Sequence, residues 1–386
     1  MSGTGTPVLW VCGPSGVGKT TVAWEIYAEL ARGGADVGYV DIDQLGMCFP
    51  ERESDPGRYR LAAENLGAVV AGYRAAGARA VVVSGIVDPA SGVHADKIPD
   101  IALTTCRLRA DADELTRRLT ARQGDDAMVA DALAEAEALD AIDFGDLCVD
   151  TTGLPPDRVV QLVRERTAGW ADPLGPGAAG EPAEPAPPAE NPDGPILWLC
   201  GPTGVGKSAA GFNLFLRYVL GRQLSGAFVD LDQIGFYPPA PAGARPDHEM
   251  RARILAAMWR TFRAAGAQAL TIVGPAESDE AIAAYARALP AATVTVCRLH
   301  AGREELTRRI VLRGQGASWA QPGDPLIGRP AAHLSTVVDH AVADAAELDR
   351  TAVGAVRVDT DNRTPEEVAD AIVARTGWPA QQHADH

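Results

Sequence analysis

The chain has 386 residues, a length that suggests two or three domains. Hydrophobic residues make up 46% and charged residues 22%, as in an ordinary globular protein with enough apolar material for a core. The formal net charge of -16 argues against a protein that holds nucleic acid on a broad basic surface. No apolar run approaches the ~20 residues of a membrane span, and the start shows no signal-peptide pattern. We therefore expect a cytoplasmic protein that does not act at a membrane.

Two nearly identical glycine-rich loops are the strongest signal in the sequence. Gly13–Thr20 reads GPSGVGKT and Gly201–Ser208 reads GPTGVGKS, and a short apolar run precedes each. Both fit G-x-x-x-x-G-K-[ST], the phosphate loop that follows a buried strand. The chain contains three lysines, and two of them, Lys19 and Lys207, hold the position where a compact ammonium fits between phosphates. We interpret both loops as nucleotide sites rather than as turns without a ligand.

Such a loop divides its work among neighbouring residues. Backbone N–H groups point at phosphate oxygens, the lysine reaches the outer phosphates, and the hydroxyl after it can bind Mg²⁺. The sequence therefore predicts ATP and Mg²⁺ as cofactors. The nucleotide-binding candidates are Gly13, Ser15, Gly16, Val17, Gly18, Lys19, Thr20 and Thr21 in the first loop, and Gly201, Thr203, Gly204, Val205, Gly206, Lys207, Ser208 and Ala209 in the second.

A D-x-D pair follows the second predicted strand in each half of the chain. Asp41 and Asp43 return as Asp230 and Asp232, 189 residues further along. Side chains two apart in an extended segment lie on one side, and the carboxyl ends of strands border the ligand crevice of an α/β sheet. One carboxylate can hold Mg²⁺ while the other accepts a proton from an attacking hydroxyl. A solvated Asx turn is the structural alternative. The metal candidates are Thr20, Asp41, Ser208 and Asp230.

The third predicted strand ends without an acidic residue, at Ser84-Gly85 and at Gly274-Pro275. Hydrolytic P-loop motors usually carry a metal-binding acid at this place, so the pattern weighs against a motor ATPase.

Arginines cluster on a helix that comes later in each half. Arg118 and Arg122, and likewise Arg309 and Arg313, stand four residues apart and so share one helix face. Near a helix end they could clamp a transferring phosphate. The alternative is a helix C-terminus whose dipole the arginines compensate.

The motifs recur in the same order, so whole domains are repeated. We expect a first domain at 1–170, a Pro/Ala-rich flexible linker at 171–194 and a second domain at 195–380. Alternating strands and helices predict α/β domains, each with a parallel five-stranded sheet. The second half carries extra residues around 314–330, which predict a longer lid loop than in the first half. In the first half, strands are expected at 8–12, 37–41, 80–84, 103–108 and 147–150, and helices at 19–32, 58–76, 111–122, 126–141 and 155–168.

The chain resembles the small P-loop kinases in four features. These are the two loops, the D-x-D pairs, the segments CRLRADADELTRRL and CRLHAGREELTRRI, and the late VDT strands. That group includes shikimate, gluconate and adenylylsulfate kinases and chloramphenicol phosphotransferases. The resemblance implies P-loop NTPase, nucleoside-kinase-like three-layer α/β/α domains with sheet order 2-3-1-4-5. It also implies that one aspartate of each D-x-D is the base. Arg118, Arg122, Arg309 and Arg313 would be the lid arginines. Two departures stand out, namely the tandem arrangement and the short first lid.

These observations predict a Mg²⁺- and ATP-dependent phosphotransferase that acts on a small molecule and is built as an internal pseudo-dimer of homologous halves. The alternative is an ATP-binding regulatory module in which nucleotide closes the halves together without phosphoryl transfer. A polynucleotide kinase is a third possibility, which the acidic balance disfavours.

Overall fold

The computed structural model describes most of the chain in two compact units. The first unit comprises Met1–Gly46, Arg52–Ala186 and Phe236–Ala244, and the second Met47–Glu51, Pro187–Gly235 and Arg245–His386. The described residues are 5–121, 125–171, 192–219, 221, 224–238, 246–316, 324–354 and 356–379. The described residues do not include Arg122, linker residues 172–191 or residues 317–323 of the expected lid loop.

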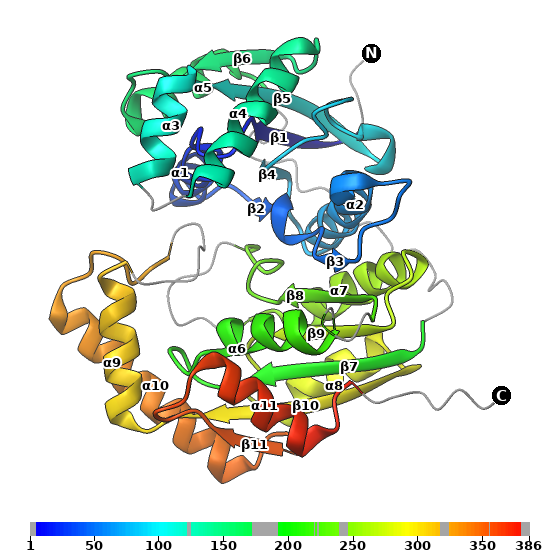
Figure 1. The fold of residues 1–386 in the computed structure, drawn as a ribbon, viewed down its shortest axis with the longest axis vertical. Helices are drawn as coiled ribbons and strands as arrows, with labels where there is room; N and C mark the ends of the chain where they lie inside the picture. Colours follow the sequence, from blue (N-terminus) through cyan, green and yellow to red (C-terminus); the bar gives the residue numbers. More distant parts are fainter. Residues whose placement is uncertain are drawn as a thin grey trace. The chain divides into compact units, whose positions relative to one another are not determined.

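The first unit alternates strands and helices, as the sequence predicts (Figure 1). All five expected strands and all five expected helices are confirmed, with ends shifted by at most a few residues. The elements are β1 (Thr6–Cys12), α1 (Lys19–Arg32), β2 (Val37–Asp41), η1 (Ile42–Gln44), η2 (Pro56–Arg58), α2 (Tyr59–Ala75), β4 (Ala80–Ser84), η3 (Ala95–Lys97), β5 (Ile101–Arg109), α3 (Ala112–Ala121), α4 (Asp126–Ala141), β6 (Leu147–Asp150) and α5 (Pro156–Arg166), where η marks a short 3-10 helix.

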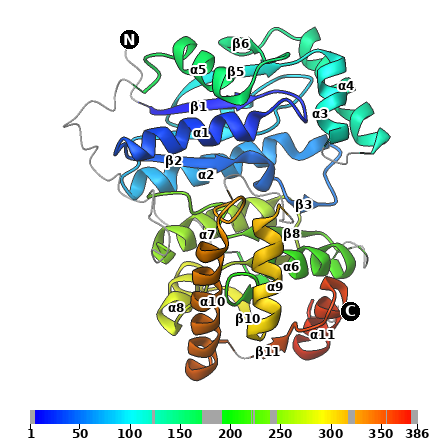
Figure 2. The same ribbon diagram turned by 90° about the vertical axis from the view of Figure 1, so that its left-hand side faces the viewer.

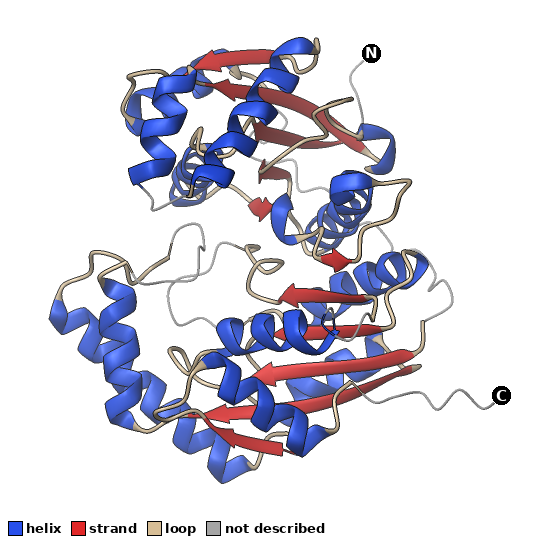
Figure 3. Ribbon diagram, viewed as in Figure 1, coloured by secondary structure: helices blue, strands red, loops and turns tan. Residues whose placement is uncertain are grey.

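The five strands of the first unit form a parallel sheet in the order β2-β4-β1-β5-β6. Counted along the chain this is order 2-3-1-4-5, the order that the resemblance implies. β1, β2 and β4 are buried along their whole length, because helices cover both faces of the sheet (Figure 3). This burial explains why the strands read as continuous apolar runs.

The two faces of the first sheet carry different helices. α1 packs beside α5 (Figure 2). Ile26 of α1 joins one core cluster with Leu9 and Tyr39 of the strands. Successive strand residues point to opposite faces, so Gly38 faces the other side. There a β-carbon at Gly38 would lie 2.4 Å from the Tyr73 ring of α2. The missing side chain of Gly38 therefore lets α2 approach the sheet.

The second unit repeats this plan. Its elements are β3 (Cys48–Phe49), β7 (Gly194–Cys200), α6 (Lys207–Leu214), the π-helical turn η5 (Phe215–Val219), β8 (Gly226–Asp230), α7 (His248–Ala264), β9 (Ala269–Val273), α8 (Asp279–Ala288), β10 (Ala292–His300), α9 (Arg303–Gly314), α10 (Ala331–Thr351), β11 (Val356–Asp359) and α11 (Pro365–Thr376). α6 and α11 pack together over one face of the sheet. On the other face Trp198 of β7 meets Tyr285 of α8, with ring centroids 4.5 Å apart.

The second sheet differs from the expected one by an additional strand. Its order is β11-β10-β7-β9-β8-β3, and the short β3 pairs antiparallel with β8. The prediction of a parallel five-stranded sheet is therefore wrong for this unit, whose sheet has six strands and is mixed. The physical reason is the free edge of β8, whose backbone N–H and C=O groups need partners. The two residues of β3 were too short a segment for an alternating pattern to reveal.

Candidate functional site

The first phosphate loop connects β1 to α1 at the carboxyl edge of the sheet. Its three glycines have positive φ, at 139° for Gly13, 82° for Gly16 and 104° for Gly18. A β-carbon at Gly13 would lie 2.2 Å from the carbonyl oxygen of Leu108, so this position needs glycine on steric as well as conformational grounds. The Nζ of Lys19 donates to the carbonyl of Pro14 at 3.1 Å. The loop therefore wraps around its own lysine.

The second loop, between β7 and α6, has the same backbone. Gly201, Gly204 and Gly206 have φ of 142°, 81° and 96°. The Nζ of Lys207 donates to the carbonyls of Gly201 at 2.9 Å and Pro202 at 3.1 Å. Burial lowers the pKa of Lys207, while the negative charges of the nearby aspartates oppose that shift. Thr203 lies in this loop and Ala209 in the first turn of α6, so the predicted binding residues are all placed at one loop.

The first aspartate of each D-x-D pair meets the hydroxyl that follows the loop lysine. Asp41 and Asp230 are each 6% exposed. Thr20 Oγ1 donates to Asp41 Oδ2 at 3.3 Å, and Ser208 Oγ donates to Asp230 Oδ2 at 2.9 Å. Ser84, at the end of β4, adds a hydroxyl at 3.0 Å from Asp41 Oδ2. The structure thus brings the four predicted metal-binding residues together in two matching pairs.

Burial is the main reason why these inner carboxyl groups have high pKa values. The pKa of Asp41 rises to about 7 and that of Asp230 to about 6, and in each case the neighbouring aspartate adds to the shift. A bound cation would reverse this shift. A hydroxyl and a carboxylate oxygen side by side suit Mg²⁺, which is bound through few protein oxygens together with substrate phosphates. Within the described ranges, no group of three or more His, Cys, Asp or Glu side chains forms a cage for a metal ion.

The second aspartate of each pair is exposed, and its side chain contacts groups other than the loop hydroxyl. Asp43 Oδ1 accepts a hydrogen bond from the backbone N–H of Ile86 at 2.9 Å. Asp232 Oδ1 instead forms an ion pair with Arg251 of α7 at 3.0 Å, and Arg251 is only 8% exposed. The two pairs therefore divide into a buried aspartate beside the loop hydroxyl and an exposed one that can reach a ligand.

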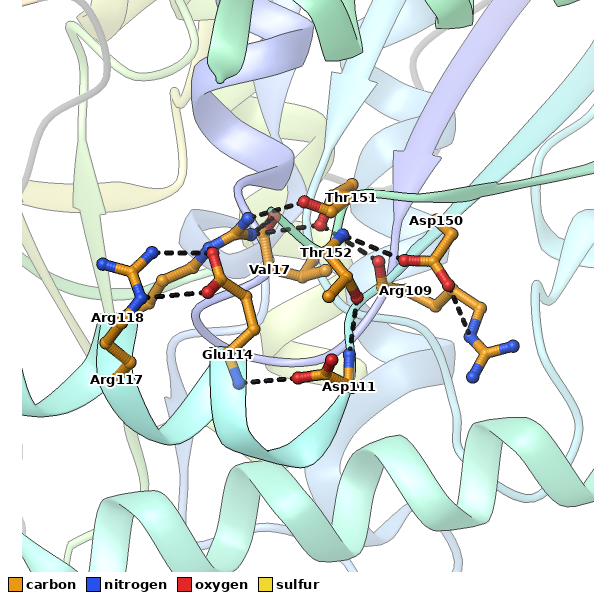
Figure 4. Close-up of polar contacts among 9 residues, drawn as sticks. All are labelled: Val17, Arg109, Asp111, Glu114, Arg117, Arg118, Asp150, Thr151 and Thr152. Carbon is orange, nitrogen blue, oxygen red and sulfur yellow. Dashed lines mark hydrogen bonds and ion pairs between the residues drawn. The ribbon is translucent and has the colours of Figure 1, made fainter. Parts of the chain in front are cut away.

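Arg118 and Arg309 occupy equivalent places and make the same contacts. The Nη1 of Arg118 donates to the carbonyl of Val17 at 3.0 Å and to Thr151 Oγ1 at 3.1 Å, and its Nη2 donates to the carbonyl of Thr151 at 2.8 Å (Figure 4). Glu114 pairs with the Nε of Arg118 at 2.8 Å. Arg309 repeats this pattern with the carbonyls of Val205 and Thr360 and the carboxylate of Glu305. In this state each guanidinium ties its helix to the phosphate loop.

The other two predicted arginines cannot be compared directly. Arg122 lies outside the described residues. Arg313, at the end of α9, donates from Nε to Asp324 Oδ2 at 2.6 Å, and its positive charge contributes to lowering the pKa of Lys207. Arg313 therefore lies within electrostatic reach of Lys207, and its role as a lid arginine stays a prediction.

A cavity of about 470 Å³ adjoins the first loop on the side of α3 and α5. Its lining includes residues of the loop, of α3 and of the segment between β6 and α5, and Val17, Gly18 and Thr21 among the predicted binding residues border it. Leu154, Pro155 and Val159 provide an apolar wall. A flat aromatic ring attached to phosphates in the loop would fit this combination.

Two acidic residues at the site were not identified from the sequence. Glu135 of α4 accepts a hydrogen bond from the backbone N–H of Ser15 at 3.0 Å. Asp344 of α10 lies within the electrostatic field of Lys207. The two residues are separated by 209 positions, the same spacing as the matching aspartates Asp150 and Asp359. Aligning the two repeats along this helix would have revealed them.

Comparison with known protein-family models and with curated proteins yields no match. Solved structures do resemble part of the chain. The tunicamycin resistance protein of Deinococcus radiodurans is 21% identical and covers 48% of this chain and 96% of its own, with a TM-score of 0.33. Shikimate kinase from Aquifex aeolicus is 15% identical, with 47% and 94% covered and a TM-score of 0.28. The APS kinase of Mycobacterium tuberculosis, solved with AMPPNP and APS, is 18% identical, with 47% and 97% covered and a TM-score of 0.30.

Each of these proteins therefore matches less than half of this chain. In the described part of the chain, no helix has the length and apolar character needed to cross a membrane.

Proposed function

We propose that the chain is a Mg²⁺- and ATP-dependent phosphotransferase acting on a small-molecule acceptor, built as a tandem repeat of two P-loop units. One observation carries the proposal. In both units, a phosphate-loop lysine and hydroxyl adjoin a buried aspartate at the end of β2 or β8, and an exposed aspartate follows it two residues later. A nucleotide loop alone binds phosphate, but the second aspartate adds a base directed at a second ligand.

The proposed reaction gives each residue a separate task. The loop amides and Lys19 or Lys207 hold the phosphates of ATP. A magnesium ion held by Thr20 with Asp41, or by Ser208 with Asp230, would neutralise phosphate charge when bound. Asp43 or Asp232 takes the proton of the acceptor hydroxyl or amine. The acceptor atom then forms a bond to the outer phosphorus, and the bond from that phosphorus to the bridging oxygen breaks and leaves ADP.

Incubation with ATP, Mg²⁺ and a metabolite extract tests the proposal. We expect one acceptor to gain the mass of a phosphoryl group, with ADP formed in equal amount. Lys19→Ala and Lys207→Ala, separately and together, assign the reaction to a unit, because removing a cation aimed at the transferring phosphate costs about 10²–10³ in rate. ATP binding without any phosphorylated product would instead favour a regulatory, nucleotide-binding role.

A further inference from the structure

A carboxylate from the helix after α3 reaches the first phosphate loop. Glu135 stands in the middle of α4, which begins behind the N-cap Asp125, whose side chain accepts the N–H of Met128 at 2.8 Å. The Oε2 of Glu135 accepts the N–H of Ser15 at 3.0 Å, across 120 residues of sequence. A loop amide of the proposed nucleotide site is therefore bonded to an anion of the chain itself.

The surroundings of Glu135 show where this carboxylate lies. Its Oε1 is buried and has no hydrogen-bond partner among the residues that the structure describes. Burial raises the pKa of Tyr59, and the negative charges of Glu135, Asp88 and Asp43 add to that rise. The carboxylate of Glu135 therefore lies against the phosphate loop and within electrostatic reach of Tyr59.

A carboxylate at this place competes with a phosphate for the same donor. Successive N–H groups of a glycine-rich loop form a concave site for anions, and an ionised acceptor makes the stronger kind of hydrogen bond with them. A phosphate oxygen cannot accept from the Ser15 N–H while Glu135 does. The two anions would also repel each other in a partly buried site.

The second unit provides an internal comparison. Asp344 is the counterpart of Glu135 in the repeat, and its side chain is shorter by one methylene. Over the described ranges, Asp344 accepts no hydrogen bond from the second loop, where Lys207 bonds to two loop carbonyls. Two loops of nearly the same sequence therefore differ in whether a side chain occupies them.

We propose that Glu135 is an internal anion that occupies the first phosphate loop until a nucleotide displaces it. This inference rests on the proposed function, since it assumes that the loop takes nucleotide phosphates. The first loop consequently binds nucleotide more weakly than the second. Displacement of Glu135 also frees the middle of α4 from the loop, so nucleotide uptake is coupled to the position of this helix.

Calorimetry with Mg²⁺ and AMPPNP tests the competition in the full chain, with Lys207→Ala silencing the second loop. Glu135→Ala removes the acceptor, and we expect the first loop to bind AMPPNP on the order of tenfold more tightly, as for the loss of one competing charged hydrogen bond. Glu135→Gln keeps a neutral acceptor and should give a smaller gain. Glu137→Ala, an exposed carboxylate on the same helix, should leave the affinity unchanged.

Hydrogen exchange provides a second, independent measurement. Without nucleotide, the peptide containing Ser15 should exchange faster in Glu135→Ala than in the parent and in Glu137→Ala. Unchanged or weaker AMPPNP binding by Glu135→Ala, or unchanged exchange at this peptide, overturns the inference while the proposed function stands. If no variant binds AMPPNP at the first loop, the nucleotide assignment of that loop is wrong and the inference falls with it.

Discussion

The two phosphate loops share one backbone conformation but are surrounded by different charged side chains. Each loop bends at three glycines with positive φ and wraps a lysine. Around the first loop, the structure places Glu135 on a loop amide. Around the second, Arg251 pairs with the exposed aspartate Asp232, and Arg313 lies near Lys207. The strand-loop-helix frame is set by glycines and packing that both units share, whereas the charges facing it come from helices that carry different side chains in the two units.

The exposed aspartates offer the largest expected difference between the units. If the second unit carries most of the turnover, Asp232→Asn should lower kcat about 10²–10⁴-fold, the range for losing a general base. AMPPNP binding should persist, because Asp232 makes no loop contact in the described structure. Asp43→Asn should cost much less if Glu135 holds the first loop. Steady-state kinetics on the acceptor found by metabolite profiling measures both.

The exposed glutamate Glu280 supplies the control, since Glu280→Gln removes one charge on α8, a helix that carries none of the proposed catalytic residues. Equal losses in Asp43→Asn and Asp232→Asn would show that both units turn over. Full activity in both variants would remove the proposed base.

The buried aspartates should affect the free energy of unfolding of the two units to different degrees. An acid whose folded-state pKa is raised holds a proton in the folded chain that the unfolded chain releases, so stability falls as pH rises through that interval. For Asp41 the interval runs from 3.8 to about 7, and for Asp230 from 3.8 to about 6. Asparagine stays neutral, and its amide can still bond to the hydroxyls of Thr20 and Ser84, which accept as well as donate.

We therefore expect Asp41→Asn to raise the free energy of unfolding at pH 8 by about 1–3 kcal/mol, and Asp230→Asn to raise it less. Both gains should vanish near pH 3.5, where the carboxyl groups are protonated in either state. Urea titrations at the two pH values, without Mg²⁺ or nucleotide, measure the difference. A loss of stability at pH 8 in either variant would mean that the carboxylate is stabilised by its neighbours rather than strained by burial.

The sequence predicts the frame of each unit better than the details of its site. Apart from β3, the strands are largely apolar runs of four to nine residues bounded by loop residues, so their positions and the sheet order could be inferred locally and by resemblance. The bond from Ser15 to Glu135 joins residues 120 positions apart, and no local pattern specifies which face of α4 turns to the loop. β3 could not be predicted either, because a segment of two residues forms a strand only when the edge of another strand is available for pairing.

The smallest expected effect is a change in Tm on replacing one of two neighbouring arginines of α3. The two variants test whether Arg118 stabilises the fold of the first unit. Arg118 is part-buried and donates to the carbonyls of Val17 and Thr151, whereas Arg117 reaches only Glu114 among the described residues (Figure 4). The Arg117 side chain is 68% exposed. Arg118→Ala leaves two carbonyls without their donor and should lower Tm by about 4–8 °C. Arg117→Ala should leave Tm unchanged, because an exposed ion pair contributes little.

A third variant extends this test of Tm to the second loop. Arg309→Ala, which removes the equivalent contacts to Val205 and Thr360, should lower Tm by a similar amount, because the frame is shared. Differential scanning fluorimetry at one protein concentration and pH measures all three variants. If Arg118→Ala keeps the parental Tm but loses nucleotide binding, the guanidinium acts on the ligand rather than on the fold, and the role expected of a lid arginine would be the better description.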